Sequence, residues 1–301
     1  GQEVSIMRST LVRTGILQSN GGLVQLNFDV EKKLANVLNT ITDFILQAKD
    51  EKEACFKDLY DRLIKPEFGF GLRRGLIPIY IAVVFHKYKN YIVVKDEHEE
   101  IELTCDLLMQ INADPSGFFL NYIDWNTEKE DYVGKLENLF KDYIIPAERD
   151  LNSYEYVVSA MKRWYLSLPK YTREVQRLSS DTTAPESYLA FISSFKKING
   201  VHEFLFKTLP DLFGTGRACD QQLVSEIGRS KEYFDTLIVN LEKKLIYTLK
   251  VLFIAPASRS MLDQMSLTSI IKDWCDKLDE KVFEQLFPDG TERCLREFQS
   301  I

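Results

Sequence analysis

The sequence predicts a mainly α-helical fold that includes a small α+β module. Over most of the chain, apolar residues recur at steps of three and four, which is the spacing of one face of a helix. Only two short segments, residues 91–95 and 118–123, are expected to be strands. Pro66 and Pro256 stand where helical patterns stop, as expected of a residue that interrupts helices. We therefore expect helices over more than half of the residues, above the typical value of roughly a third.

The first helices are expected over residues 29–47 and 51–64, and Pro66 ends the second of them. The apolar stripe of the first helix consists of Val30, Leu34, Val37, Leu38, Ile41, Ile45 and Leu46. A glycine-containing loop follows over residues 66–75. We assign residues 1–65 to an N-terminal helical segment.

The next segment, Leu76–Tyr88, is apolar and has two interpretations. Its β-branched residues are compatible with a buried strand, but Pro78 suits the first turn of a helix better than the interior of a strand, so we favour a helix. A strand, a helix and a second strand are then expected over residues 91–95, 100–112 and 118–123. This helix–strand–helix–strand order predicts a winged-helix-like module at residues 66–128.

Residues 129–301 are expected to form a helical bundle. The helical stripes cover residues 130–144, 149–168, 185–197, 220–252, 267–285 and 291–299. The pattern over 220–252 is the clearest, because its apolar residues recur at three, four or seven positions and indicate one long helix with a coiled-coil-like face. The turn residues 288–290 separate the last two helices.

The chain has 301 residues and a net charge of −7, with 45% hydrophobic and 28% charged residues. This length and composition are typical of a globular protein that buries a core without disulfide bonds. An acidic chain repels the phosphates of nucleic acids, so nucleic-acid binding would require a local basic patch.

Cysteine usage and hydropathy indicate the compartment. The five cysteines are Cys55, Cys105, Cys219, Cys275 and Cys294. They form no CxxC motif, and we expect them mainly as buried thiols in a reducing cytoplasm, with a reactive thiol as the alternative. The longest apolar run, Leu76–Phe85, is too short to cross a bilayer, which takes about 20 residues, and the chain starts without a signal-peptide pattern. We therefore expect a cytoplasmic protein without membrane contact, and Gly1 in place of a methionine indicates a piece excised from a longer protein.

The familiar catalytic and cofactor motifs are missing from the sequence. The glycines of Gly69–Gly75 are spaced GxGxxxG rather than GxGxxG and follow a helix, so we interpret them as a tight turn and not as a phosphate loop. The three histidines, His86, His98 and His202, are far apart and match no zinc motif, and there is no GxSxG. We expect no cofactor, no metal and no catalysis. The third-ranked alternative is an unrecognised enzyme. Clustered carboxylates in a strongly acidic cleft would favour it.

The winged-helix-like module invites a DNA-binding interpretation that its charges oppose. No lysine or arginine lies between Lys95 and Lys129, and acidic residues are frequent there. A recognition helix lies beside phosphates that carry one charge per ~1.7 Å of duplex, and these would repel helix 100–112. We expect the module to be structural or protein-binding.

A nucleic-acid or acidic-partner contact is better placed in residues 162–177. Its candidate contact residues are Lys162, Arg163, Lys170, Arg173 and Arg177. Trp164, Tyr165 and Tyr171 alternate with these cations, as in surfaces that combine phosphate contacts with base stacking. Trp164, Tyr165 and Leu168 lie on one helical face, so we favour the interpretation that they belong to the core and that the cations form an ordinary solvated edge, with the nucleic-acid or acidic-partner contact as the alternative.

Several turn and packing motifs resemble a known family. They are Pro66…Gly71-Leu72-Arg73-x-Gly75-Leu76-Ile77-Pro78, Asp114-Pro115-x-x-Phe118, Trp164-Tyr165-x-x-Leu168-Pro169-x-Tyr171-Thr172, Leu178-Ser179 and Leu205-x-x-x-Leu209-Pro210. They are similar to stretches of the large ATP-dependent proteins of bacterial phage-defence islands, the BREX-system ATPases of the BrxC and PglY type. In that family a P-loop region elsewhere in a longer chain binds ATP. The resemblance, over roughly residues 60–215, therefore implies an accessory, non-ATPase region.

We therefore expect a non-catalytic interaction or scaffold region of a large multidomain bacterial protein of antiviral defence. The resemblance implies other domains of the parent chain and defence-system proteins as partners. A nucleic-acid-binding module that uses residues 162–177 is the alternative. A large exposed apolar patch would favour the scaffold hypothesis, and a continuous basic surface would favour the alternative.

Overall fold

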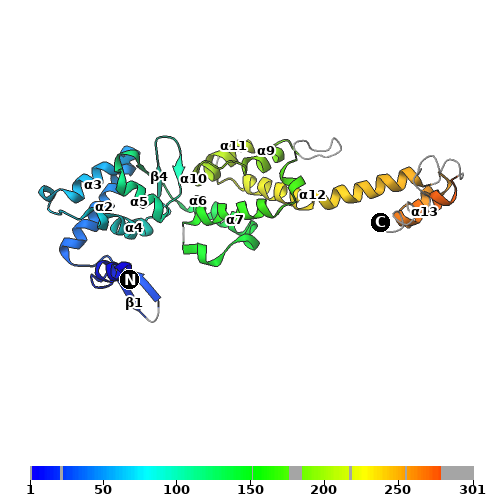
Figure 1. The fold of residues 1–301 in the computed structure, drawn as a ribbon. Coiled ribbons are helices and arrows are strands. Elements are labelled where there is room, and N and C mark those ends of the chain that lie inside the picture. Colours follow the sequence, from blue (N-terminus) through cyan, green and yellow to red (C-terminus); the bar gives the residue numbers. More distant parts are fainter. Residues whose placement is uncertain are drawn as a thin grey trace. The chain divides into compact units, whose positions relative to one another are not determined.

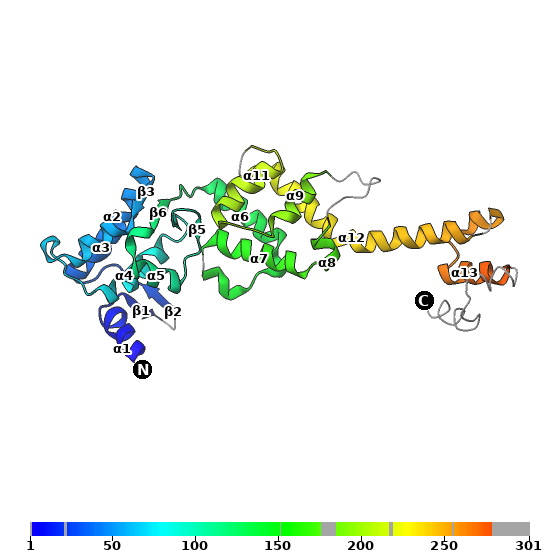
Figure 2. The same cartoon turned by 45° about the horizontal axis from the view of Figure 1, so that its top comes forward.

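The computed structural model describes residues 2–20, 23–150, 152–175, 185–216, 219–254 and 256–278. It is 68% helical with small antiparallel sheets, which confirms the predicted mainly α fold with a small α+β module (Figure 1 and Figure 2). The chain forms two compact units, residues 1–230 and residues 231–301. None of the helices in the described part of the chain is long and apolar enough to span a membrane.

The first unit begins with a short helix and a hairpin that were not predicted from the sequence. Its elements are α1 (Gln2–Met7), a π-helical stretch (Arg8–Val12), β1 (Leu17–Asn20) and β2 (Leu23–Leu26). The two strands pair antiparallel, with Leu17 opposite Leu26. The signal was present, because Asn20-Gly21 is a dipeptide typical of hairpin turns.

A four-stranded antiparallel sheet with the order β3-β6-β4-β5 forms the centre of the α+β module. Its strands are β3 (Glu53–Cys55), β4 (Ile92–Lys95), β5 (Glu100–Ile101) and β6 (Phe119–Tyr122). Strands β4 and β6 match the two predicted strands. The prediction that strands occur only in those two segments is wrong, because β3 and β5 are also strands. Residues of β3 and β5 were assigned to helices 51–64 and 100–112. The second helix starts later because Thr104 caps it, its side chain accepting a hydrogen bond from the Leu107 N–H.

Four helices are interspersed with the strands of this sheet along the chain. They are α2 (Lys32–Glu51), α3 (Phe56–Ile64), α4 (Ile77–Lys87) and α5 (Cys105–Ala113). The ambiguous segment Leu76–Tyr88 is therefore helical, as favoured, and Pro78 lies in its first turn. Its helix α4 buries residues on nearly all sides, which explains the continuous apolar run that resembled a buried strand.

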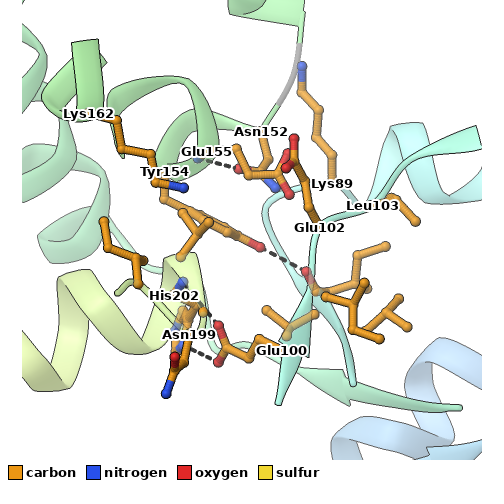
Figure 3. A pocket seen from close by; sticks show the side chains of 17 residues that line it. Lys89, Glu100, Glu102, Leu103, Asn152, Tyr154, Glu155, Lys162, Asn199 and His202 are labelled. Carbon is orange, nitrogen blue, oxygen red and sulfur yellow. Dashed lines mark hydrogen bonds and ion pairs between the residues drawn. The ribbon is translucent and has the colours of Figure 1, made fainter. Parts of the chain in front are cut away.

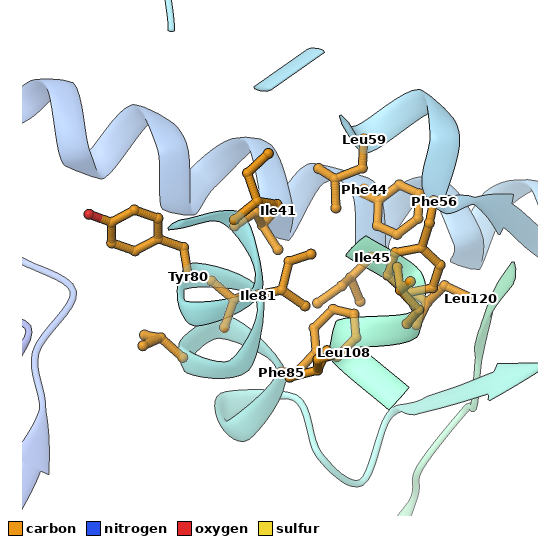
Figure 4. Close-up of a cluster of buried hydrophobic side chains, with 14 of the residues drawn as sticks. Ile41, Phe44, Ile45, Phe56, Leu59, Tyr80, Ile81, Phe85, Leu108 and Leu120 are labelled. Atoms are coloured by element: carbon orange, nitrogen blue, oxygen red, sulfur yellow. The ribbon is translucent and has the colours of Figure 1, made fainter. Parts of the chain in front are cut away.

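One hydrophobic core joins these helices to the sheet. Phe44 of α2, Phe56 of α3 and Phe85 of α4 are in ring contact, with centroid distances of 5.2 Å and 6.0 Å (Figure 4). The same cluster of buried residues extends from Leu11 to Leu120. Buried residues on both sides of the boundary predicted between residues 65 and 66 therefore belong to one cluster.

The rest of the first unit is helical. Its elements are α6 (Thr127–Leu139), α7 (Ser153–Ser167), α8 (Lys170–Arg173), α9 (Ser187–Ser194), α10 (Val201–Glu203), α11 (Leu209–Leu212) and the start of α12 (Gln221–Phe253). Trp164 of α7 is fully buried, and its ring contacts Phe140, Phe191 and Phe195 at centroid distances of 5.5–5.9 Å. Aromatic packing of this kind explains why helices α7 and α9 lie together.

The second unit contains the rest of α12, a short 3-10 helix (Pro256–Met261) and α13 (Leu267–Asp276). Ile254, Leu262 and Ile270 form its small buried cluster. Helix α12 confirms the single long helix predicted over 220–252. Helix α13 matches the start of the helix predicted over 267–285. The predicted turn 288–290 and helix 291–299 lie outside the described residues.

Candidate functional site

The structure divides the predicted basic-aromatic segment between core and surface. Trp164 and Leu168 are buried, and the half-buried ring of Tyr165 stacks on Phe195 at a centroid distance of 5.3 Å. The core interpretation of Trp164 and Leu168 is thereby confirmed. Tyr171 is exposed, so one aromatic side chain of the set is free to stack on a ligand.

The predicted cations also separate into different environments. Arg163 donates two hydrogen bonds to the carboxylate of Glu148, at 2.8 Å and 2.7 Å, and a third to the carbonyl of Tyr143 at 2.7 Å. Arg173 is half-buried with its guanidinium 5.9 Å from the Tyr165 ring.

Lys162 and Lys170 are exposed, and Arg177 lies outside the described residues. The bidentate pair occupies the fork of the Arg163 guanidinium that would otherwise grip a phosphate. Of the four predicted cations that the structure describes, Arg163 is therefore paired internally and Arg173 is half-buried, whereas Lys162 and Lys170 are exposed.

A different set of polar residues meets at a cavity of about 140 Å³, called here the junction cavity. It lies between the sheet and the helices that follow it (Figure 3). Strands β4 and β5 with the loop after β5 form one wall, and the start of α7 and the start of α10 form the other. Its polar lining residues are Lys89, Glu100, Glu102, Asn152, Tyr154, Glu155, Lys162, Asn199 and His202.

Glu100 of β5 is used structurally inside this cavity. Its side chain is only 8% exposed, and its carboxylate accepts the backbone N–H groups of His202 at 3.1 Å and Glu203 at 3.2 Å. Burial alone would raise the pKa of Glu100, but these hydrogen bonds and the nearby His202 side chain lower it overall. The carboxylate thus remains ionised and caps the N-terminus of α10.

Further polar contacts cross the cavity. The hydroxyl of Tyr154 donates to the Ile92 carbonyl at 2.8 Å, and the Ser153 N–H donates to the Asn90 side chain at 3.0 Å. Asn152 caps α7, because its side-chain oxygen accepts the Glu155 N–H at 2.7 Å. The bonds made by Tyr154 and Ser153 connect strand β4 and the residues before it to the first turn of α7.

Glu155 is the perturbed acid of the junction cavity. Burial and, to a smaller extent, the neighbouring carboxylate of Glu102 raise its pKa, bonds from Asn152 and the Leu103 N–H partly oppose this, and the net pKa is about 7. A carboxyl group with this pKa exchanges a proton near neutral pH. The cavity is nevertheless well below the ~300–1,000 Å³ of a typical small-molecule site, so its volume suits a few waters.

The sequence patterns did not indicate a site at the junction cavity. Glu100, Glu102 and Asp106 were grouped as acids that repel DNA, and Glu155 was not singled out. The available signals were weak: Asn152 is a favoured cap residue, and Gly200 stands before a short helix. Sequence order alone does not reveal that Glu100 and Gly200 meet.

The first unit also carries an open apolar groove of about 940 Å³. It is lined by Met7, Leu11, Leu17, Val24, Gln25, Leu26, Pro78, Ile79, Ala82, Val83, His86, Cys105, Leu108 and Met109. The side chains of Val24 and Met109 are 67% and 60% exposed. Apolar side chains gathered in one groove and open to solvent are typical of a protein-binding surface.

The cysteines and acidic clusters offer no metal chemistry in the described residues. Cys55, Cys105, Cys219 and Cys275 are free thiols, and Cys294 lies outside the described residues. The expectation that they are buried is wrong for those four, since Cys105 is exposed and the others are half-buried. In the part of the chain that the structure covers, no group of three or more His, Cys, Asp or Glu residues could hold a metal ion.

Comparison with known proteins adds no family to this description. No protein-family model matches the chain, and no curated protein or solved structure matches it.

Proposed function

We propose that this chain is a non-catalytic interaction and scaffold region of a larger, multidomain bacterial ATP-dependent protein of antiviral defence, acting in the cytoplasm. The apolar groove is the observation that carries the interaction function. The resemblance of the turn and packing motifs to BREX-system ATPases supports the assignment to antiviral defence.

The packing of these motifs supports a structural role for them. Arg74 fills the unspecified position between Arg73 and Gly75 of the first motif, and its guanidinium donates to the carbonyls of Asn112 at 2.7 Å and Ala113 at 3.1 Å. These carbonyls directly precede Asp114, where the second motif begins and where the Asp114 side chain accepts the Ser116 N–H at 3.1 Å. The segments that carry these two motifs therefore meet at the end of α5.

The occupant that best fits the apolar groove is an amphipathic helix of a partner protein. Helices α4 and α5 supply two apolar walls, and the hairpin β1–β2 with residues 7–11 supplies the others. Met7 and Met109 are flexible, polarisable side chains that adapt to different apolar ligands. A helix with apolar residues at steps of three and four is a common ligand of such a groove.

Selection from a displayed library of amphipathic helical peptides tests this proposal. Peptides enriched on the wild-type protein should carry apolar residues at helical spacing and should lose at least tenfold in affinity on Met109→Glu. Leu166→Glu is the matched control, because Leu166 is an exposed apolar residue, 62% exposed, that does not line the groove. No enrichment, or equal binding to Met109→Glu, would refute the interaction function at this groove.

Nucleic-acid binding through residues 162–177 is the second proposal. The exposed Lys162, Lys170 and Tyr171 support it, whereas the internal pairing of Arg163 weighs against it. The winged-helix-like identity of the α+β module is also a proposal, supported by the order α4, β4, α5, β6. Helix α5 remains a poor candidate for groove binding, because no lysine or arginine lies between Lys95 and Lys129.

A further inference from the structure

A separate pocket of the first unit, called here the α2 pocket, has a volume of about 470 Å³. It lies between Arg13 and Thr14 after the π-helical stretch, the start of α2, the glycine-containing loop before α4, and Tyr80 of α4. Its volume is within the ~300–1,000 Å³ of a typical small-molecule site. None of its lining residues lines the apolar groove or the junction cavity. Its apolar walls are Leu34, Val37, Phe70 and Leu72.

Tyr80 presents a polar group to the α2 pocket from the edge of the hydrophobic core. The residue is only 6% exposed, and Figure 4 shows its hydroxyl pointing away from the other labelled side chains of the core. Within the part of the chain that the structure describes, no hydrogen bond engages this hydroxyl. Burial raises the pKa of Tyr80, so the hydroxyl stays protonated at neutral pH and can donate a hydrogen bond. A hydroxyl placed in this way is a group that a bound ligand can satisfy.

Two cations line the same pocket. Arg13 and Lys33 are exposed, and among the described residues no ion pair or hydrogen bond engages their side chains. Together with the carboxylate of Glu31, they leave the lining net positive, although the whole chain has a net charge of −7. A lining with one excess positive charge suits a monoanion such as a carboxylate better than a doubly charged phosphate group.

The first turn of α2 adds to this positive potential. The first N–H groups of a helix have no partner within the helix and form the positive end of its dipole. In α2 the N-cap residue Glu31 makes no side-chain hydrogen bond to them. Lys32 and Lys33 occupy this turn, which contains no acidic residue, although acids are the residues favoured there. An anion bound beside the start of α2 relieves this unfavourable arrangement.

From these observations we infer that the α2 pocket binds a small organic monocarboxylate with an apolar body. Its carboxylate accepts hydrogen bonds from the Arg13 guanidinium, the Lys33 ammonium and the Tyr80 hydroxyl, and its apolar body contacts Val37 and Leu72. The guanidinium fork matches the two oxygens of a carboxylate. This ligand goes beyond the proposed interaction function and does not depend on what the apolar groove binds.

The first test uses hydrocinnamate as the probe, because it joins one carboxylate to an apolar body. In isothermal titration calorimetry with the 301-residue protein, it should bind at least about tenfold more tightly than two control ligands. Hydrocinnamyl alcohol has the same body without the charge, and acetate has the charge without the body. In NMR spectra the methyl signals of Val37 and Leu72 should shift on binding, whereas those of Val24 in the apolar groove should not.

The second test compares variants of the polar lining residues. Arg13→Gln should weaken hydrocinnamate binding by about tenfold and leave binding of the alcohol unchanged, since it removes charge-assisted hydrogen bonds to the carboxylate alone. Tyr80→Phe keeps the buried ring and should weaken hydrocinnamate binding roughly threefold to tenfold. Arg8→Gln is the matched control, because Arg8 is an exposed arginine of the same π-helical stretch that does not line the pocket.

Three results would overturn the inference. They are a lack of hydrocinnamate binding, equal affinities for hydrocinnamate and its alcohol, and a loss of affinity in Arg8→Gln as large as in Arg13→Gln. Methyl shifts confined to the apolar groove would also overturn it, because they would place the ligand outside the α2 pocket.

Discussion

The carboxylate of Glu100 occupies the space that a Cβ atom at Gly200 would need. An ideal Cβ at residue 200 would lie 2.5 Å from Oε2 of Glu100 and 2.7 Å from its Cβ. The backbone of Gly200 is extended, so the restriction is one of space rather than of backbone conformation. This close approach lets a side chain of β5 reach the N-terminus of α10.

Replacing Gly200 with Ala should therefore destabilise the first unit by roughly 1–3 kcal/mol, the usual cost of overpacking a filled site. Urea unfolding measures this change. Gly134→Ala is the control, because this helical glycine of α6 has no atoms within 4 Å of an added Cβ. That control should be neutral or stabilising by up to about 1 kcal/mol. In a Glu100→Ala background, the cost of Gly200→Ala should nearly vanish; a full cost there would mean that another contact is responsible.

The stability of the first unit should fall as pH rises from about 4.5 to 7 because of Glu155. Its pKa is about 7 in the folded protein and near the ordinary value of 4.5 in the unfolded chain. Between these values the folded state binds the extra proton, so the free energy of unfolding decreases with rising pH; above 7 both states are ionised. Relative to Glu155→Gln, the wild type should lose roughly 1–3 kcal/mol across this window. Parallel profiles of the two proteins in urea unfolding would contradict the assignment.

Arg163 should matter for stability rather than for binding. Arg163→Ala removes the bidentate pair with Glu148 and the bond to the Tyr143 carbonyl, which join α7 to the turn before it. We expect a loss of roughly 1–3 kcal/mol in urea unfolding, as for charge-assisted hydrogen bonds that leave a half-buried partner unpaired. Lys170→Ala, at an exposed cation, should change the stability little. A loss no larger than that of Lys170→Ala would show that the pair contributes nothing.

Any DNA binding should depend on the basic segment and not on α5. Replacing Lys170, Arg173 and Arg177 with Ala should flatten the slope of log affinity against log salt by about 0.9 per lost phosphate contact on duplex DNA. Changing Glu102 and Asp106 to Gln should leave the affinity unchanged or slightly higher. Glu100 is excluded from this set, because its replacement would uncap α10. If the triple variant bound DNA tightly with an unchanged salt slope, the DNA-binding surface would lie outside the basic segment.

Local patterns were sufficient to predict the helices that carry long apolar stripes. The leucine spacing over 220–252 predicted α12, and Pro78 resolved the apolar run of Leu76–Tyr88 in favour of α4. The same reasoning placed Trp164 in the core as one of two alternatives, and it is buried. Such elements are predictable because their hydrogen bonds and their apolar periodicity lie within one continuous segment.

Short strands were missed because a strand of two or three residues has no measurable period of its own. Glu53–Cys55 becomes β3 by pairing with residues of β6, and Glu100–Ile101 becomes β5 by pairing with β4. The single core across the predicted boundary at 65/66 follows from the same pairing, since β3 lies before the boundary and β6 lies after it.

The chain's composition and periodicity were enough to establish a mainly helical protein with a small α+β module. The junction cavity could not be read from them, because Glu100 and His202 are separated by 102 positions and meet only when β5 docks beside α10. The raised pKa of Glu155 has the same origin: burial and the approach of Glu102 are properties of the folded arrangement. Local hydrogen bonding and hydrophobic spacing are determined by neighbouring residues in the sequence. The environment of a charged group depends instead on which distant segments surround it.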